Sequence, residues 1–435
     1  MALQQDPVSR SLQLDRALLM ERQGLAAEAH AELERLARES GDAPSLLVHL
    51  ARALRFAGRG AEARSRIEAA LRRWPADPGL HRALAQLRWD AGDGVAAVAA
   101  LERAIVDYPR ELPLRLVAAD VLRAVGDAPR ALELLEGGLA LAPGSVAFLT
   151  SAGVVLDTLD RPHEALPYLR AAAGQAGDRG VAAHNLIAVL LRTGAAEEAL
   201  RLSNELTSAS PADQQLIAYR ATALRMLGDG EYTRLYDYQR LVRVYEPSAP
   251  AGFADLAAFN AMFARELMAL HRATHRPLAQ SLRGGTQTER NLPRDHPVVA
   301  AFFAMIDAPI RDYIARLDIS CDHPTDRRKS AGYRIAGSWS VSLAPGGFHL
   351  DHVHPQGWLS SAYYVELPGE MDANSRAGWL KFGEPGMRLP GLGPQHFVRP
   401  RPGALVLFPS YMWHGTVPFE GDGRRLTAAF DVVPA

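Results

Sequence analysis

The first half of the chain repeats itself every 34 residues, which leaves few folds open to it. Glycine recurs at this spacing, except that Asp160 stands at one step: Gly24, Gly58, Gly92, Gly126 and Gly194. Alanine follows five residues after each of the six positions: Ala29, Ala63, Ala97, Ala131, Ala165 and Ala199. Proline follows seventeen residues after four of them: Pro75, Pro109, Pro143 and Pro211. Three residue types in one phase indicate an array of stacked, similar units.

Each of the three residue types has a role in a helical hairpin. Glycine accepts the positive φ that ends one helix, alanine lets two helices approach closely, and proline starts the next helix. The stretches between them, such as residues 61–74, are amphipathic and favour helix. Residues 10–228 thereby resemble the tetratricopeptide repeat family. Gly228 keeps the spacing but Thr233 replaces the alanine, so we expect the array to end there.

The resemblance implies an α-solenoid whose concave face holds a peptide or a partner protein. A spacer or a dimerisation surface is the alternative. Residues 229–255 lose the repeat and gain tyrosines and prolines, so we expect a linker there and a second domain over 256–435. Helical periodicity over 254–272 and 296–317 predicts two helices at the start of that domain.

From about Tyr333 onward, short segments of alternating apolar and polar residues replace the helical pattern. Turns rich in proline and glycine separate them, as at Pro368-Gly369 and Pro402-Gly403. Several short strands at such spacing predict a β-sandwich or barrel. The chain is thus expected to be multidomain, an α-solenoid followed by a β domain.

Four histidines form a candidate cluster in this β region, namely His349, His352, His354 and His414, whereas His396 is read as a loop residue. A closely spaced pair with a distant third histidine is typical of facial iron sites, which keep positions open for cosubstrate and O₂. Residues two apart on a strand share a face, so His352 and His354 form one candidate set. Their neighbours Phe348 and Leu350 are apolar, which favours this set as the inward one.

The competing set is His349 and Asp351, which share the other face with Val353. The segment His349-Leu350-Asp351 spells a His-x-Asp ligand pair, so this alternative stays open. We expect His349 and Asp351 to lie behind the ligands or to face the substrate.

Four ordered blocks resemble the 2-oxoglutarate- and iron(II)-dependent oxygenases that are often fused to tetratricopeptide repeats. The blocks are residues 352–368, 378–385, 402–419 and 424–431, and the resemblance covers about residues 275–435. It implies a double-stranded β-helix, a jelly roll that holds Fe(II) between its two sheets, with 2-oxoglutarate as cosubstrate.

The family's His-x-His-Pro pattern corresponds to His352 and His354, and its distal histidine to His414, so the resemblance implies these three as catalytic metal ligands. Arg425, which opens the last expected strand with Arg424 in the turn before it, would grip the far carboxylate of 2-oxoglutarate through its planar fork. Tyr364 could donate a hydrogen bond to the same carboxylate. His354 stands where a carboxylate is commoner, and Asp351 is the nearest replacement for it.

Composition excludes several other classes. Lys plus Arg number 48 and Asp plus Glu 49, so the net charge of −1 provides no field for nucleic acid or an anionic membrane. Cys321 is the only cysteine, which excludes an internal disulfide and a cysteine-based zinc site. The absence of a leader-like start and of a long apolar run predicts a cytoplasmic protein.

The expected function is therefore an Fe(II)- and 2-oxoglutarate-dependent hydroxylase acting on a protein or peptide held by the repeats. One alternative is a non-catalytic interaction protein with a degenerate jelly roll. Another is a cupin-like metalloenzyme that does not use 2-oxoglutarate, in which Arg425 would be dispensable.

Overall fold

The computed structural model describes residues 7–22, 26–40, 43–175, 180–271, 282–288, 291–319, 322–369 and 375–435. Gly24 and Cys321 lie outside these residues. The chain forms two compact units. The first comprises Met1–Gln175 with Arg272–Gln280 and Glu289–Asn291, and the second comprises Ala176–His271, Ser281–Thr288 and Leu292–Ala435. No helix in the described ranges is both long and apolar enough to cross a membrane.

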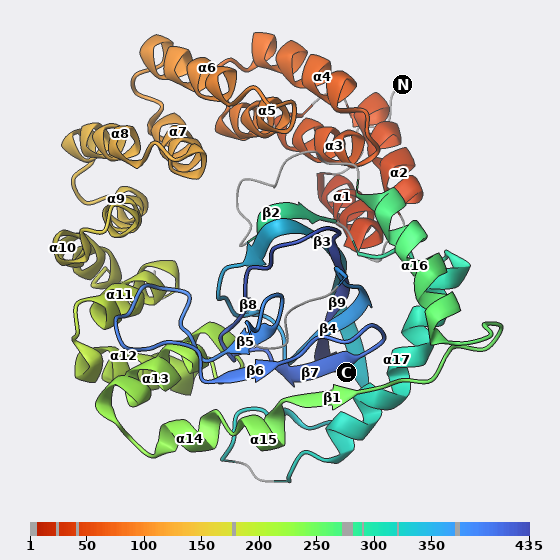
Figure 1. The fold of residues 1–435 in the computed structure, drawn as a ribbon. Helices are drawn as coiled ribbons and strands as arrows, with labels where there is room; N and C mark the ends of the chain where they lie inside the picture. Colours follow the sequence, from red (N-terminus) through yellow and green to blue (C-terminus); the bar gives the residue numbers. More distant parts are fainter. Residues whose placement is uncertain are drawn as a thin grey trace. The chain divides into compact units, whose positions relative to one another are not determined.

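The first unit is built of helical hairpins, drawn from red to yellow in Figure 1. Each odd-numbered helix packs against the even-numbered helix that follows, and α3, α5, α7 and α9 also stack on one another in succession. This is the expected solenoid. The helices are α1 (Pro7–Arg22), α2 (Ala26–Ser40), α3 (Pro44–Phe56), α4 (Gly60–Arg73), α5 (Pro78–Asp90), α6 (Gly94–Asp107), α7 (Leu112–Val125), α8 (Ala128–Leu141), α9 (Val146–Thr158) and α10 (Pro162–Ala173).

The repeat glycines and alanines do what the sequence predicts, whereas the repeat prolines lie in the turns before the next helices and do not start them. The described repeat glycines adopt positive φ, for example 76° at Gly58 and 98° at Gly126. Asp160, at the step without glycine, takes the same left-handed conformation with φ 59°, which aspartate tolerates better than most residues. The six repeat alanines are buried, each at most 1% exposed, because the two helices of each hairpin close over them.

The second unit contains the remaining helices and all the strands. The helices are α11 (Val181–Arg192), α12 (Ala196–Ala209), α13 (Gln214–Leu227), α14 (Glu231–Leu235), α15 (Tyr238–Leu241), α16 (Leu256–Leu270), α17 (Pro297–Ala315) and the 3₁₀ helix η1 (Asp326–Arg328). The strands are β1 (Arg243–Tyr245), β2 (Leu282–Gln287), β3 (Tyr333–His349), β4 (Leu359–Glu366), β5 (Leu380–Phe382), β6 (His396–Val398), β7 (Leu405–Pro409), β8 (His414–Thr416) and β9 (Arg425–Pro434).

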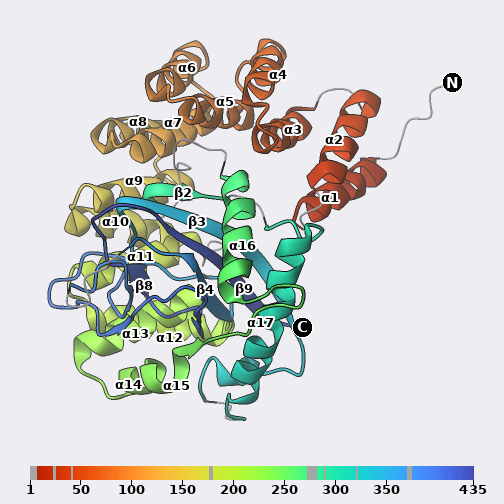
Figure 2. The same cartoon turned by 45° about the vertical axis from the view of Figure 1, so that its right-hand side comes forward.

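The strands form two antiparallel sheets, as expected for a jelly roll. The larger sheet has the order β1-β7-β4-β9-β3-β2, and the smaller has the order β6-β5-β8. One face of the larger sheet is covered by α16 and α17, which lie alongside it in Figure 2. Leu426, Phe430 and Val432 of β9 pack there against Phe263 of α16 and Phe302 of α17.

Period-two alternation sends the intervening residues of β9 to the opposite face. Arg425, Thr427 and Asp431 therefore point into the space between the sheets. Residues paired with them in the ladder share that face: Tyr364 lies opposite Thr427, and Ser360 opposite Asp431. This inner face carries the candidate site.

The predicted linker at 229–255 differs from the structure. It contains α14, α15 and β1, and β1 pairs with β7 of the larger sheet. Moreover, α11 to α13 belong to the second unit. Ile217, Ala221 and Leu224 of α13 share a core with Val353 and Phe408, so the last repeat helices and the β domain form one folded body.

Candidate metal centre

Three histidines converge between the two sheets. His352 and His354 lie in the segment between β3 and β4, and His414 begins β8. The backbones of His352 and His414 pair as an isolated bridge, with N–H···O distances of 3.0 and 3.1 Å. One ring nitrogen from each of the three residues lies within 4.8 Å of the others. The geometry therefore brings together the set that the sequence analysis favoured.

The second ring nitrogen of each histidine is fixed by an oxygen acceptor. The three Nδ1 atoms lie 2.7 Å from the Leu350 carbonyl oxygen for His352, 2.9 Å from the Met412 carbonyl oxygen for His414, and 2.5 Å from Asp431 Oδ1 for His354. Since these partners are acceptors, each Nδ1 carries the proton and donates. In the neutral ring Nε2 then has a lone pair, the state a metal-ligating imidazole needs.

Burial keeps two of these imidazoles, those of His352 and His414, neutral. It lowers the pKa of His352 to about 4, with the neighbouring His354 adding to the effect. Burial likewise lowers the pKa of His414 well below its ordinary value. Near neutral pH both rings can therefore bind a cation without first losing a proton.

The competing pair is arranged differently. Asp351 accepts a hydrogen bond from Lys381 Nζ at 2.7 Å and is not a member of the cluster. Burial raises the pKa of Asp351 to about 6, and the Lys381 ammonium opposes that shift. The ring of His349 lies 5.5 Å from that of His352, centre to centre. His349 thus borders the cluster while the Asp351 carboxylate is held by a lysine.

Leu350, the apolar neighbour that favoured the face of His352 and His354, is not buried as expected. Leu350, assigned to the inward set, is 40% exposed, whereas Val353, assigned to the outward set, is 7% exposed. Beyond the end of β3 the segment leaves regular strand geometry, so strict alternation no longer decides which side chains are buried.

Arg425 and Tyr364 form a second polar group on the inner face. Arg425 is 3% exposed, and burial lowers its pKa from the ordinary value. Its Nε donates to the carbonyl oxygen of Gly378 at 3.1 Å, and its guanidinium carbon lies 5.0 Å from the centre of the Tyr364 ring. No carboxylate among the described residues pairs with Arg425. The Tyr364 hydroxyl is buried and makes no hydrogen bond of good geometry, although it interacts with the Arg425 guanidinium.

His349 lies near both the histidine cluster and Arg425. Its pKa is lowered well below the ordinary value by burial, and both His352 and Arg425 add to that shift through their charges. The neighbouring Arg424 is unlike Arg425, because it is partly exposed and pairs with Glu366 at 3.0 Å.

Sequence reasoning missed Asp431, Ser360 and Lys381. Asp431 lies six residues after Arg425 in the last sequence block, and six is an even number, so strand parity could have placed both on one face. Ser360 and Lys381 carried no comparable signal. Trp358 belongs to the core, and its Nε1 donates to the Thr325 carbonyl oxygen at 2.9 Å.

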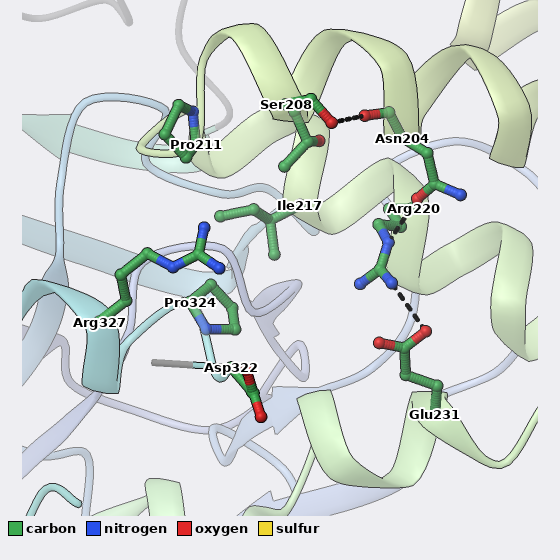
Figure 3. A pocket seen from close by; sticks show the side chains of 10 residues that line it. Asn204, Ser208, Pro211, Ile217, Arg220, Glu231, Asp322, Pro324 and Arg327 are labelled. Atoms are coloured by element: carbon green, nitrogen blue, oxygen red, sulfur yellow. Dashed lines mark hydrogen bonds and ion pairs between the residues drawn. The ribbon is translucent and has the colours of Figure 1, made fainter. Parts of the chain in front are cut away.

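A separate cavity of about 340 Å³ lies beside α12 and α13 (Figure 3). Arg220 spans one side of it and is bonded to Asn204 and Glu231. None of the three clustered histidines lines this cavity, so it is not part of the candidate metal centre.

Comparison with family models identifies both parts of the chain. Residues 337–431 match the family described as "Putative 2OG-Fe(II) oxygenase". Residues 49–111 and 116–179 match the tetratricopeptide repeat. The chain therefore contains a tetratricopeptide repeat region and a domain similar to the 2OG-Fe(II) oxygenases. A comparison with curated proteins found no match.

Solved structures resemble parts of the chain. A thermophilic tetratricopeptide repeat protein of Thermus thermophilus is 23% identical, with 42% of this chain and 100% of that chain covered and a TM-score of 0.34. YrrB, a repeat protein described as having an unusual peptide-binding site, is 19% identical over 38% and 86%, with a TM-score of 0.31. A prolyl-4-hydroxylase of Pseudomonas putida is 15% identical over 46% and 97%, with a TM-score of 0.30.

Proposed function

We propose that this protein is an Fe(II)- and 2-oxoglutarate-dependent hydroxylase. The observation that carries the proposal is a single one: three inward-facing imidazoles share the space between the sheets with a buried guanidinium that has no carboxylate partner among the described residues. A metal cluster alone would suit many enzymes. The added cationic group calls for an anionic cosubstrate beside the metal.

The donor set fits a divalent iron ion. Imidazole nitrogen is a common ligand of iron, and three protein ligands leave positions open for cosubstrate and O₂. His352, His354 and His414 would hold the ion. When bound together, Fe(II) and 2-oxoglutarate supply the chemistry that activates O₂ and hydroxylates a C–H bond, with succinate and CO₂ as coproducts.

Arg425 and Tyr364 would bind the carboxylate of 2-oxoglutarate remote from the metal. A guanidinium fork donates two parallel hydrogen bonds to a carboxylate, and the buried Tyr364 hydroxyl could add a third. The bound carboxylate would also neutralise a cation that is otherwise costly to bury.

Apolar side chains around the cluster would keep water out. Val341, Leu343 and Phe382 are each at most 3% exposed. The ring of Phe408 packs 4.6 Å from that of His414, centre to centre. A dry site strengthens the charge interactions that hold and orient an anionic cosubstrate.

We further propose a protein or peptide substrate. The support is architectural: repeat arrays present extended surfaces suited to polypeptides, and the repeat region occupies the chain ahead of the oxygenase-like domain. Residues of the site itself do not specify the oxidised group, so this part of the proposal rests on domain composition.

The test is cosubstrate turnover. Iron-loaded protein supplied with 2-oxoglutarate and air should release succinate, and His352→Ala should release none. Succinate release that is unaffected by Arg425→Ala would show that the 2-oxoglutarate anchor is assigned to the wrong residue, whereas metal binding without any succinate release would favour the cupin-like alternative. A wild-type protein that binds Fe(II) but never converts 2-oxoglutarate would contradict the proposal.

A further inference from the structure

The three clustered histidines supply no negative charge to a bound metal ion. Most facial iron sites include one ligating carboxylate, which lowers the net charge of the bound ion. Here all three clustered groups are imidazoles, and Asp351, the carboxylate nearest in sequence, is held by Lys381 instead. Another source of negative charge would therefore be expected close to the ligands.

Among the described residues, Asp431 is the carboxylate in contact with the cluster. Its Oδ1 lies 2.5 Å from His354 Nδ1. The other two histidines donate from Nδ1 to backbone carbonyl groups, which carry no net charge. The carboxylate thus acts on His354 alone, at the ligand position where a carboxylate is usually found.

The surroundings of Asp431 leave its charge available to His354. No arginine or lysine in the described part of the chain forms an ion pair with it; its partners are His354 and a serine hydroxyl. Both side chains are largely buried, with exposed fractions of 16% for Asp431 and 13% for His354. Trp339 packs against His354 with ring centres 5.4 Å apart and limits solvent on that side.

Two serines hold this pair in place. Ser360 Oγ donates to Asp431 Oδ1 at 2.8 Å and lies 3.0 Å from His354 Nδ1. Ser410 Oγ lies 2.9 Å from Ser360 Oγ, and the backbone N–H of His354 donates to the Ser410 carbonyl oxygen at 3.0 Å. The orientation of the His354 ring relative to Asp431 is therefore fixed on several sides.

We propose that Asp431 is a positioning residue that supplies, through His354, the negative charge that a ligating carboxylate would otherwise provide. A carboxylate that accepts from Nδ1 fixes the tautomer, orients Nε2 and makes the imidazole a stronger electron donor. Asp431 and His354 together would take the place of a single ligating carboxylate. This inference rests on the proposed metal site.

Asp431→Asn is the informative variant, because the amide oxygen can still accept from His354 while the charge is lost. We expect Fe(II) and Co(II) affinity, measured by anaerobic titration of the full chain, to fall roughly 10–100-fold. The reduction potential of the bound iron should rise, since removing negative charge disfavours Fe(III). Thermal unfolding of the metal-free protein should change little.

Ser361→Ala is the matched control. Ser361 is also a buried serine of β4, but it bonds to Phe430 and does not contact His354. The metal affinity of this variant and the reduction potential of its bound iron should stay at the wild-type values. In a His354→Asp background, where the carboxylate returns to the ligand position, adding Asp431→Asn should no longer weaken metal binding.

The possible results distinguish the role of Asp431 from the existence of the metal site. Unchanged affinity and potential in Asp431→Asn would overturn the inference. So would a loss of affinity that comes with a lower unfolding temperature and an unchanged potential, because that pattern indicates a structural role. If the wild-type protein binds no metal, the proposed function fails before Asp431 is tested.

Discussion

At the residue scale, the site depends on a few side chains whose neighbours in sequence behave differently. Arg425 is buried and pairs with no carboxylate among the described residues, whereas Arg424 is partly exposed and already paired with Glu366. His352 faces the cluster, whereas Asp351, one residue earlier, bonds to Lys381. Such adjacent pairs provide matched variants, because each replacement is made in the same strand or loop.

Replacing Arg425 by alanine should weaken 2-oxoglutarate binding without affecting iron. Losing two charge-assisted hydrogen bonds in a partly dry site costs about 2–4 kcal/mol, or roughly a 30–1,000-fold loss of affinity. Arg425→Lys should recover only part, since an ammonium lacks the planar fork. Calorimetric titration of the iron-loaded variants measures this. If Arg424→Ala shows the larger loss, the assignment of the anchor is wrong.

The choice of ligand face predicts a pattern across five alanine variants. His352→Ala and His414→Ala should abolish iron binding, His354→Ala should weaken it severely, and His349→Ala should leave it largely intact. Asp351→Ala distinguishes the two candidate ligand faces, and equilibrium dialysis with Fe(II) measures iron binding in each variant. Should Asp351→Ala lose iron as completely as His352→Ala while His354→Ala retains it, the other face holds the metal.

At the element scale, α13 is both the last repeat helix and a support for the candidate metal centre. The indole Nε1 of Trp413, beside His414, donates to Thr222 Oγ1 on α13 at 3.0 Å. The first amide of α13, on Gln214, donates to the carbonyl oxygen of Pro355, next to His354. Both segments that carry the histidines are thus held by one helix.

A truncation series follows from this packing. A fragment that begins at residue 256 loses α13 and β1 and would expose Val353 and Phe408, at a cost of about 1.5–3 kcal/mol for each large apolar side chain. We expect it to aggregate or to lose iron binding, whereas residues 176–435 should stay folded and retain the metal. Size-exclusion chromatography with iron analysis distinguishes them. A well-folded, iron-binding 256–435 fragment would contradict the account.

The repeat region shows which structural features a periodic sequence can predict. Period, turns and buried alanines were all predictable, because each residue type serves its own hairpin, and Asp160 shows that position matters more than identity. The boundary was not predictable in the same way. A period reports which helices pair, but not that α13 shares a core with a sheet formed more than a hundred residues later.

The candidate site, too, was predictable from the sequence only in part. His352, His354 and His414 could be proposed from spacing and from the ordered blocks around them. The contact of Asp431 with His354 spans 77 residues and depends on the register of β9 against β4. That register follows from long-range pairing, which local sequence does not encode strongly.

At the scale of the whole molecule, buried histidines should make stability depend on pH. His323 is 3% exposed, and burial lowers its pKa to about 4 from an ordinary value of 6.5. The unfolded chain therefore binds a proton between about pH 6.5 and pH 4 that the folded chain does not. Stability is complete above that window and falls as the pH drops through it.

The shift of about 2.5 pH units corresponds to at most about 3 kcal/mol from this one group. His323→Gln, which cannot titrate, should show a correspondingly smaller loss of stability between pH 7 and pH 4. Urea unfolding followed by tryptophan fluorescence measures both proteins at each pH. An equal loss in the two would mean that His323 does not contribute to acid sensitivity.

The central claim is that three histidines hold iron beside an arginine that holds 2-oxoglutarate. Anaerobic titration of 2-oxoglutarate into iron-loaded protein tests it most directly. The account predicts one 2-oxoglutarate bound per iron, with binding strongly weakened in Arg425→Ala and unchanged in Arg424→Ala. Iron-loaded wild-type protein that binds no 2-oxoglutarate would contradict it.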